Sequence, residues 1–399
     1  MPKISLVIGI RPDVIRSSLI IRRLKELLGD EFEFIWSGQH YSDNMKDIFF
    51  RQLGVPHPDL ELQVDTSTDG TLIGSLTTAL HAHLSLSKPE AVIFLGDTNT
   101  VTSSLAAAAL NIPIVHIEGC MRSYDWRMPE EKYRTAIDHL ADVIYAYVDE
   151  YKQQGVIEGL NPKSIVVTGN PIVDVLEHYF ISGLLRLSEA DKSRLLAEFD
   201  FQGGNLWTLT CHRRENIEDK RALQAILNLA GACQGRVAFP AGYRTQAKIA
   251  EFGLTLPPNV VMTDPIGYAE LMELVSSSVA VLTDSGTVVE EAAVLGVVSV
   301  QMRTSTERPQ VYDNGGSVKF DPHGTIDLKH LETIISSAYE RSKISWVHTL
   351  GDGNASERIV EDLLRRIEEN DWSGHDPDEG LRPISRNYGY GHNDRGMPR

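Results

Sequence analysis

The chain has 399 residues, of which 42% are hydrophobic, and this length suits two globular domains with buried cores. A formal net charge of −17 at pH 7 argues against nucleic acid and anionic membranes as partners, because an acidic surface repels both. The 3 cysteines form no CxxC pair, which argues against a disulfide framework and favours a cytoplasmic protein. No apolar run approaches the roughly 20 residues that a membrane span needs.

The first part of the chain alternates short apolar runs with amphipathic segments. Strands are expected at residues 4–9, 32–37, 91–95, 114–117, 143–146 and 165–167, and helices near 14–28, 44–53, 72–86, 101–110, 131–140 and 150–158. This alternation predicts a mostly parallel sheet with helices on both faces. Right-handed crossovers then bring every strand-to-helix loop to one edge of that sheet.

A break at Thr168-Gly169-Asn170-Pro171 precedes a second series of the same kind. Strands are expected at 206–210, 237–239, 260–262, 280–282, 298–301 and 317–320, and helices from about 172 and near 220–229, 245–252, 268–276, 288–295 and 328–336. We therefore predict an α/β chain of two doubly wound, Rossmann-like domains, 1–170 and 171–355, with a ligand cleft between them. A helix at 356–370 is predicted to pack back on the first domain, and 373–399 form a polar tail.

Three carboxylates fall where open α/β sheets bind ligands, at strand ends or at a helix start: Asp97, Glu118 and Glu130. Asp97 equally fits a helix cap. Glu118 lies just past an apolar strand, where a carboxylate needs partners, and this favours a function. Glu130 suits a first helical turn, and its neighbour Glu131 is interpreted as a plain capping acid. The three are candidates for general acid–base chemistry.

A turn with two arginines follows the first expected strand. The segment Gly9–Asp13 closes that strand and opens a helix, and Pro12 fits the first helical turn. Free backbone N–H groups at this helix start, together with Arg11 and Arg16, suit a diphosphate. An ordinary turn with solvated arginines is the alternative. The segment is not a GxGxxG fingerprint, so it gives no support to NAD binding.

A cationic loop, Cys211–Asn216, follows the first strand of the second series and contains His212 and Arg213. Its position at a ligand edge makes it a good phosphate clamp, although a solvated charge run is the alternative. Cys211 is interpreted as a small buried residue.

Further polar residues lie at helix starts in the second series. Ser285, Gly286 and Thr287 can offer N–H and hydroxyl groups to phosphate, although a plain N-cap is the alternative. Glu291, farther along the same helix, can hold ribose hydroxyls. Tyr268 begins another helix, next to a segment that can frame a base. The histidines show no HExxH or zinc spacing, so no metal is expected.

In this order, the motifs resemble those of the non-hydrolysing UDP-N-acetylglucosamine 2-epimerases, which have a GT-B fold related to that of glycosyltransferases. The resemblance covers about residues 3 to 370. It rests on Gly9–Asp13, Ser37-Gly38-Gln39-His40, Gly96-Asp97-Thr98, His116-Ile117-Glu118, Pro129-Glu130-Glu131, Thr168-Gly169-Asn170, Cys211–Asn216, Thr283–Gly286 with Glu290-Glu291, and Thr306-Glu307-Arg308-Pro309.

The resemblance implies epimerisation at C2 of a UDP-activated N-acetylated amino sugar, with loss and re-addition of UDP through a 2-acetamidoglucal. It implies Asp97, Glu118 and Glu130 as acid–base residues and His212 as a fourth catalytic residue that neutralises the diphosphate. The implied substrate-binding residues are Arg11, Arg16, Arg213, Tyr268, Ser285, Gly286, Thr287, Glu291 and Arg308. It also implies a homodimer, and neither a metal nor another cofactor.

Several positions depart from the family's pattern. Arg16 replaces a lysine, Cys120 replaces a glycine, and Thr287 replaces the second glycine of Ser-Gly-Gly. The segment after Pro240 lacks the family's histidine, and no Arg-Gln pair of the kind found in allosterically regulated members occurs near Val64–Thr71. These traits resemble the subgroup that acts on UDP-N-acetylfucosamine-type or other modified sugars.

Three other functions remain open at this point. One is a GT-B glycosyltransferase, and a second is a hydrolysing epimerase that releases ManNAc and UDP. The third is a nucleotide-sugar sensor without catalytic activity, against which the acids and His212 argue.

Overall fold

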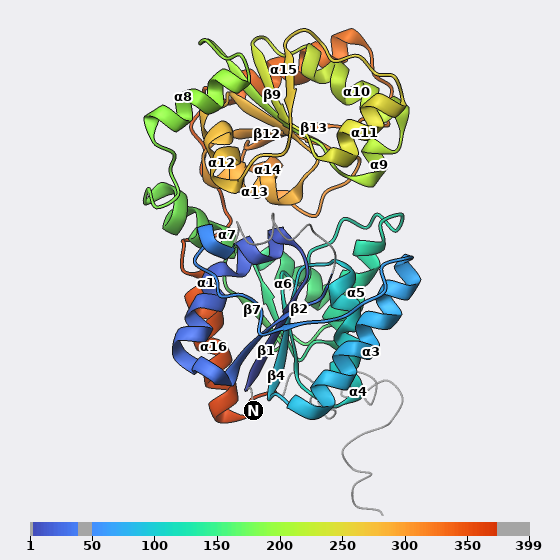
Figure 1. Cartoon of the computed structure of the whole chain (residues 1–399), viewed down its shortest axis with the longest axis vertical. Helices are drawn as coiled ribbons and strands as arrows, with labels where there is room; N and C mark the ends of the chain where they lie inside the picture. Colours follow the sequence, from blue (N-terminus) through green and yellow to red (C-terminus); the bar gives the residue numbers. More distant parts are fainter. Residues whose placement is uncertain (1–2, 39–49, 373–399) are drawn as a thin grey trace, which may run out of the picture. The chain divides into compact units, whose positions relative to one another are not determined.

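The computed structural model describes residues 3–38 and 50–372. Most of the helix expected near 44–53, residues Gln39 and His40, and the tail at 373–399 lie outside this part of the chain. The chain divides into two compact units, one of Met1–Met121, Trp126–Asn170 and Asn354–Arg399, the other of Arg122–Asp125 and Pro171–Gly353. Each unit is built on one parallel sheet with helices around it (Figure 1).

The sheet of the first unit has seven strands in the order β3-β2-β1-β4-β5-β6-β7, and all its pairings are parallel. The strands are β1 (Ile4–Ile8), β2 (Phe32–Trp36), β3 (Leu60–Glu61), β4 (Ala91–Leu95), β5 (Ile114–Ile117), β6 (Val143–Ala146) and β7 (Ile165–Val167). Every residue of β1 and β4 is buried, as is typical of parallel strands covered by helices on both faces. The strand order reverses between β1 and β4, which is where such sheets bind ligands.

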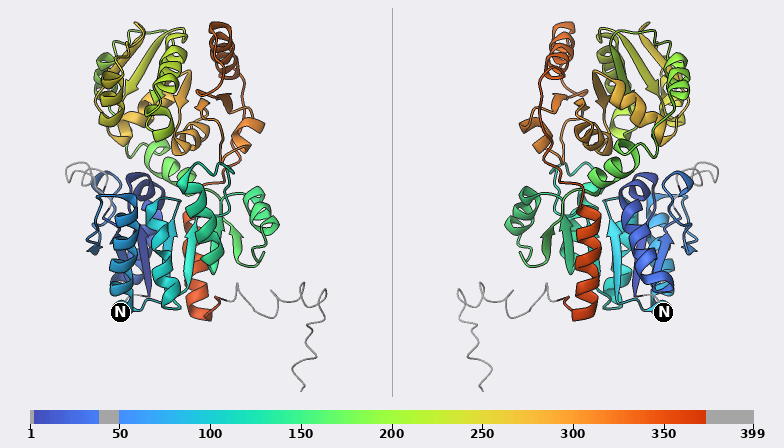
Figure 2. Two further views of the ribbon diagram at one scale, coloured as in Figure 1. Left: turned by 90° about the vertical axis from the view of Figure 1, so that its right-hand side faces the viewer. Right: turned by 90° about the vertical axis from the view of Figure 1, so that its left-hand side faces the viewer.

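The helices of the first unit follow their strands in alternation. They are α1 (Arg11–Leu28), η1 (Gly29–Glu31), α3 (Asp69–Ser87), η2 (Asn99–Ser103), α4 (Ser104–Ala109), α5 (Pro129–Leu140), α6 (Asp149–Ile157) and α16 (Ala355–Glu369). Helix α16, red in Figure 2, returns from the end of the chain and contacts α1, drawn in blue. It is tied to this unit by Arg358 Nη1, which donates to Thr168 O over 3.1 Å, and by Tyr145, whose hydroxyl donates to Asp362 over 3.0 Å.

The sheet of the second unit has six strands in the order β10-β9-β8-β11-β12-β13, again all parallel. The strands are β8 (Leu206–Thr210), β9 (Arg236–Pro240), β10 (Val260–Thr263), β11 (Ala280–Thr283), β12 (Val298–Met302) and β13 (Ser317–Phe320). Here the order reverses between β8 and β11. The loops after these two strands are therefore the expected ligand position of this unit.

The helices of the second unit cover both faces of its sheet. They are α7 (Pro171–Val175), η3 (Leu176–Ile181), α8 (Glu189–Glu198), α9 (Arg214–Ile217), α10 (Lys220–Gly231), α11 (Tyr243–Glu251), α12 (Tyr268–Ser277), α13 (Gly286–Val294), α14 (Gln310–Asp313) and α15 (Leu328–Arg341). Trp207 and Leu209 of β8 pack into the larger core, whereas Leu206 packs into a second cluster with residues of α8 and α12. Alternate strand residues thus point to opposite faces, which is the period that a two-sided core requires.

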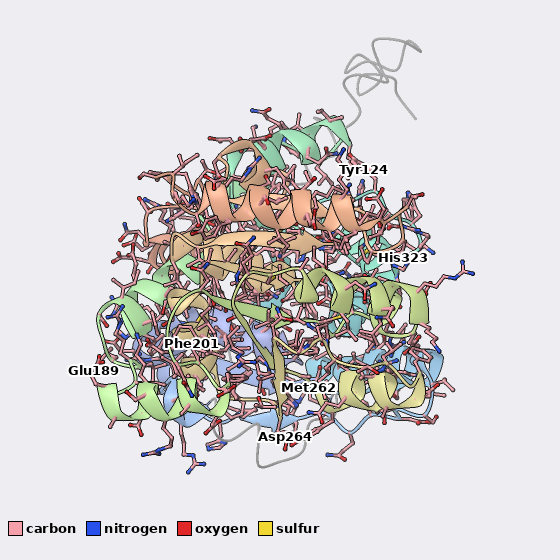
Figure 3. The ribbon with its side chains drawn as sticks, turned by 90° about the horizontal axis from the view of Figure 1, so that it is seen from above. Tyr124, Glu189, Phe201, Met262, Asp264 and His323 are labelled. Carbon is pink, nitrogen blue, oxygen red and sulfur yellow. The ribbon has the colours of Figure 1, made fainter. Side chains whose placement is uncertain are left out.

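The structure confirms the predicted α/β class, and six expected strands match to the residue: 91–95, 114–117, 143–146, 165–167, 206–210 and 317–320. Three expectations were incomplete. The helix expected from about 172 ends at Val175 and continues as a π-helix, Leu176–Ile181. Helix α8 was not predicted; Glu189 at its start and Phe201 just past its end are labelled in Figure 3. The edge strand β3 was also missed, because two residues carry no periodic signal.

Within the described ranges, no helix combines the length and apolar character needed to cross a membrane.

Candidate active site

Three strand ends bring acids and arginines together in the first unit. Helix α1 follows β1 and carries Asp13 and Arg16, Asp97 follows β4, and Glu118 follows β5. The turn after β5 is tight, since Glu118 has a φ of 77° and Cys120 a φ of 63°. Non-glycine residues adopt such angles only where their surroundings impose them, and they cluster at functional sites.

Arg16 lies between two carboxylates. Its Nη2 is 2.9 Å from Asp13 Oδ1, and its Nη1 forms an ion pair with Glu118. The arginine is 4% exposed, so the structure places its guanidinium on two acids in a buried position, and not in the solvated state considered as an alternative. Its predicted contact with a diphosphate stays a prediction. Arg11 begins α1, but its side chain lies outside the described part of the structure.

Asp13 has an unusual environment for a carboxyl group. The side chain is fully buried, and its Oδ2 has no hydrogen-bond partner among the described residues. Burial raises the pKa of Asp13 to about 6, although Arg16 beside it acts in the opposite direction. The sequence analysis gave Asp13 no role of its own.

A second arginine, Arg134, links two further carboxylates. Its Nη1 donates to Glu131 Oε2 over 2.7 Å, and its Nη2 forms an ion pair with Asp97. The interpretation of Glu131 as a plain capping acid is wrong: α5 has no side-chain cap, and Glu131 is 1% exposed against Arg134. Glu130, one residue earlier, is half-buried in the first turn. Sequence reasoning missed Arg134, although its spacing from Glu131 on an expected helix was a usable signal.

The buried pair His116 and Asp138 connects the two turns that carry Asp97 and Glu118. His116 Nδ1 is 2.7 Å from Asp138 Oδ1, and its Nε2 is 2.8 Å from Gly96 O. The other oxygen of Asp138 accepts a hydrogen bond of 2.9 Å from the backbone N–H of Cys120. Both ring nitrogens of the histidine thus face oxygen atoms, one of a carboxylate and one of a backbone carbonyl. His116 and Asp138 therefore fix the backbone on either side of the two acids.

In the second unit, Asp284 organises the cationic loop. Its carboxylate accepts hydrogen bonds from the backbone N–H groups of His212 (3.1 Å) and Arg213 (3.0 Å) and from Asn216 Nδ2 (3.1 Å). Its carbonyl accepts a bond of 2.8 Å from Arg213 Nε. The His212 side chain is 60% exposed, and its Nδ1 lies 3.4 Å from Asp284 Oδ1. Asp284 thus fixes the backbone of the loop, while the imidazole of His212 remains accessible to solvent. Sequence analysis quoted Asp284 in a motif and gave it no role.

Burial, together with the adjacent Asp284 carboxylate, raises the pKa of Cys211 well above its usual range. The thiol is 3% exposed and stays protonated, which agrees with its interpretation as a small buried residue.

The start of α13 lies against Arg308. Ser285 is the N-cap, and its hydroxyl accepts from the N–H of Val288 over 3.4 Å, so the capping alternative holds for this side chain. A β-carbon on Gly286 would lie 2.4 Å from Arg308 Nη1, so a side chain there requires the Arg308 guanidinium to move. Arg308 is 5% exposed, and its Nε donates to Glu290 Oε1 over 2.6 Å. Thr287 follows in the first turn and is half-buried.

Two further residues line the interior side of this helix. Glu291 is 2% exposed and Tyr268 is 5% exposed. Burial, reinforced by the nearby Glu291 carboxylate, raises the pKa of the Tyr268 phenol well above its usual range, so the hydroxyl remains protonated. The Tyr268 hydroxyl and the Glu291 carboxylate are thus adjacent polar groups in the interior of this unit.

Among the described residues, no group of three or more His, Cys, Asp or Glu side chains has the geometry to hold a metal ion. The two units offer functional groups of different kinds. The first presents carboxylates held by arginines, which suits proton transfer, and the second presents a cationic loop and a helix start, which suits an anion.

Comparison with known proteins identifies the family. The family model described as UDP-N-acetylglucosamine 2-epimerase matches residues 23–364. The chain is 33% identical to the UDP-N-acetylglucosamine 2-epimerase of Methanocaldococcus jannaschii, over 90% of this chain and 98% of that protein. It is also 33% identical to the UDP-2,3-diacetamido-2,3-dideoxy-D-glucuronate 2-epimerase of Pseudomonas aeruginosa, over 91% and 99%.

Solved structures agree. The M. jannaschii UDP-GlcNAc 2-epimerase in complex with UDP-GlcNAc and UDP matches with a TM-score of 0.82 at 30% identity, covering 91% of this chain and 99% of that one. The Neisseria meningitidis enzyme bound to UDP-GlcNAc matches with a TM-score of 0.78 at 25% identity, covering 91% and 99%. These likenesses confirm two Rossmann-like sheets of the GT-B type. The chain belongs to the family of non-hydrolysing UDP-N-acetylglucosamine 2-epimerases.

Proposed function

We propose that the protein epimerises C2 of a UDP-activated 2-acetamido sugar by eliminating and re-adding UDP. Family membership supports this reaction, because relatives that align with 90% of the chain carry the name UDP-N-acetylglucosamine 2-epimerase. The observation that carries the proposal is the position of Asp97 and Glu118 at the ends of the neighbouring strands β4 and β5, each paired with its own arginine.

The reaction needs one group that removes the C2 proton and one that returns a proton to the opposite face. Removal of that proton turns the C2–H electron pair into a C1–C2 double bond and expels UDP with the electrons of the C1–O bond. The product is 2-acetamidoglucal. A proton then adds at C2, and a UDP oxygen attacks C1, which restores the original linkage. We propose that Asp97, Glu118 and Glu130 divide these proton transfers.

The leaving diphosphate gains negative charge, and fixed donors and cations stabilise such charge. We propose that His212 and Arg213 of the cationic loop contact it, together with N–H groups of Ser285, Gly286 and Thr287 at the start of α13. The exposed ring of His212 and the fixed path of its loop support this assignment.

Two arginines of α1 complete the proposed diphosphate environment. Arg11 is proposed to bind phosphate at the start of the helix. Arg16 is proposed to offset the charge from its position beside Glu118, because its guanidinium already contacts two carboxylates.

We propose that Tyr268, Glu291 and Arg308 bind the nucleoside end of the substrate. The Tyr268 hydroxyl and the adjacent buried Glu291 carboxylate are polar groups of the kind that bind ribose hydroxyls. Arg308 fixes the start of α13 by packing against Gly286.

The sugar itself is the part of the proposal that relatives leave open. Relatives named for UDP-N-acetylglucosamine and for UDP-2,3-diacetamido-2,3-dideoxy-D-glucuronate are both 33% identical to this chain, so identity does not choose between them. We propose UDP-GlcNAc, with UDP-ManNAc as its product, as the first substrate to test and the diacetamido sugar as the second.

Proton NMR of the purified protein in deuterated water with each UDP-sugar tests the reaction. We expect deuterium at C2 and a sugar that remains attached to UDP. Epimerisation without label would contradict proton transfer at C2. Release of free ManNAc would indicate a hydrolysing enzyme. Turnover that requires an acceptor would indicate a glycosyltransferase, and binding without turnover would indicate a sensor. Glu118→Gln should abolish labelling and still bind UDP.

We also propose a cytoplasmic homodimer that needs no metal and no other cofactor. The buried cysteines Cys120, Cys211 and Cys233 form no disulfide with one another, which supports a reducing compartment. Light scattering after size exclusion tests the dimer, and activity in the presence of EDTA tests the independence from metal.

A further inference from the structure

Arg134 joins an acid of its own helix to an acid that follows a strand of the first unit. Its side chain extends from the second turn of α5 to Asp97, which lies 37 positions earlier in the chain and just past the end of β4. The arginine is 2% exposed, whereas the Asp97 side chain is 25% exposed. The Asp97 carboxylate thus contacts a buried guanidinium while part of its side chain remains accessible to solvent.

The arrangement repeats a pattern found at Arg16. In each case an acid in the first turn of a helix binds an arginine three residues later, Asp13 with Arg16 and Glu131 with Arg134. Each arginine also contacts an acid that follows a different strand of the sheet, Glu118 after β5 and Asp97 after β4. The helix acid and the arginine offset each other's charge, so the net charge of each cluster is that of the strand-end carboxylate alone.

We propose that Arg134 is the positioning residue for Asp97, whose carboxylate it orients through a guanidinium that Glu131 holds in place. This inference rests on the proposed epimerase function. Arg134 acts on the substrate only through Asp97, because its guanidinium is enclosed between the two carboxylates. A guanidinium suits this task better than an ammonium group, since its planar fork donates in two fixed directions at once.

The test begins with kinetics of Arg134→Met. A misplaced reacting group costs about 100-fold in rate, so kcat should fall by about that factor while KM changes by less than about threefold. Arg134→Lys should recover part of the loss in kcat, because lysine restores the positive charge but not the planar, two-directional donor geometry of the guanidinium. A raised KM with unchanged kcat would overturn the proposal and show that Arg134 binds substrate directly.

Arg366→Met is the matched control. Arg366 is also a buried arginine on a helix of the first unit, 6% exposed, and its Nε donates to Asp362 Oδ2 over 2.7 Å. Losing it should destabilise the fold to a similar degree and leave kcat per folded molecule unchanged. Equal losses of kcat in both variants would overturn the proposal, because they would make the effect of Arg134→Met a general loss of stability.

A double-mutant cycle isolates the path through Asp97. In an Asp97→Asn background, Arg134→Met should lower kcat by less than about threefold, since the group that it positions is already altered. If the double variant instead lost kcat by the product of the two single-variant factors, the proposal would be overturned.

A crystal structure of Arg134→Met gives a readout that does not depend on activity. We expect the Asp97 carboxylate to leave its present position or to occupy more than one rotamer. An unchanged Asp97 would overturn the proposal even if turnover fell. If the wild-type protein labels no UDP-sugar in deuterated water, the proposed function fails, and this crystallographic comparison still decides whether Arg134 positions Asp97.

Discussion

The sulfur of Cys120 fills the space that a β-carbon on Gly155 would need. Such a carbon would lie 2.6 Å from Cys120 Sγ and 2.8 Å from Ile165 Cδ1. Cys120 is fully buried in the turn after β5, with a φ of 63° that favours glycine. The glycine on α6 and the cysteine in the Glu118 turn therefore compete for the same space.

Gly155→Ala is expected to destabilise the protein by about 1–3 kcal/mol, because overpacking a filled core forces side chains or backbone to shift. Cys120→Gly in the same chain should recover most of that loss, since it vacates the space and removes the strain of the positive φ. Equilibrium urea unfolding of the two single variants and the double variant measures the coupling. Losses that simply add would show that the two residues do not compete for space.

Gly286→Ala is expected to weaken UDP binding by about tenfold, because a misaligned donor at a phosphate site costs at least the worth of one charge-assisted hydrogen bond. The new β-carbon would lie 2.4 Å from Arg308 Nη1 and 2.7 Å from its Cζ, so Arg308 must leave Glu290. Isothermal titration with UDP measures the effect. Gly242→Ala is the control, because a β-carbon there meets nothing within 4 Å. Equal affinities in both variants would remove the role assigned to the contact with Arg308.

Asp284→Asn is expected to lower stability by about 1.5–3 kcal/mol and to weaken UDP binding, because hydrogen bonds to a charged group are worth about that much. The amide cannot accept all the N–H bonds that now hold His212 and Arg213. Asp219→Asn is the control, since Asp219 accepts backbone N–H bonds at the start of α10 and asparagine caps a helix nearly as well. Thermal unfolding and UDP titration of both variants give the comparison. A variant at position 284 that behaves like the control would contradict the role given to Asp284.

The sequence predicted the parts of this site that depend on local pattern. Buried apolar runs located the strands, and acids or cations just past them located the ends where chemistry concentrates, as at Asp97 and Glu118. The partners of these residues could not be predicted, because ion pairs such as Asp97 with Arg134 join positions far apart in the chain. Glu131 was misread although its partner Arg134 is only three residues away on α5, because a capping acid and an i,i+3 ion pair are both local explanations of the same position.

Asp13 gives the fold a defined response to pH. Burial raises its pKa from the ordinary value of 3.8 for an aspartate to about 6, so the folded state binds a proton more tightly than the unfolded state does. The folded state therefore holds more protons between these two values, and the free energy of unfolding falls as pH rises through this window. A shift of this size corresponds to about 3 kcal/mol of stability that is present below about pH 4 and lost above about pH 6.

Asp13→Asn removes this titration and keeps the shape of the side chain. Relative to this variant, the wild-type protein should be at its most stable near about pH 4 and should lose that advantage by about pH 7. Urea unfolding of both proteins at several pH values measures the difference, in which the other titrating groups cancel. Asp59→Asn is the control, because Asp59 lies on the surface of the same unit and its side chain is 40% exposed beside Lys25. A wild-type advantage that grew with pH would show that Arg16 dominates over burial and that Asp13 is ionised in the folded protein throughout this range.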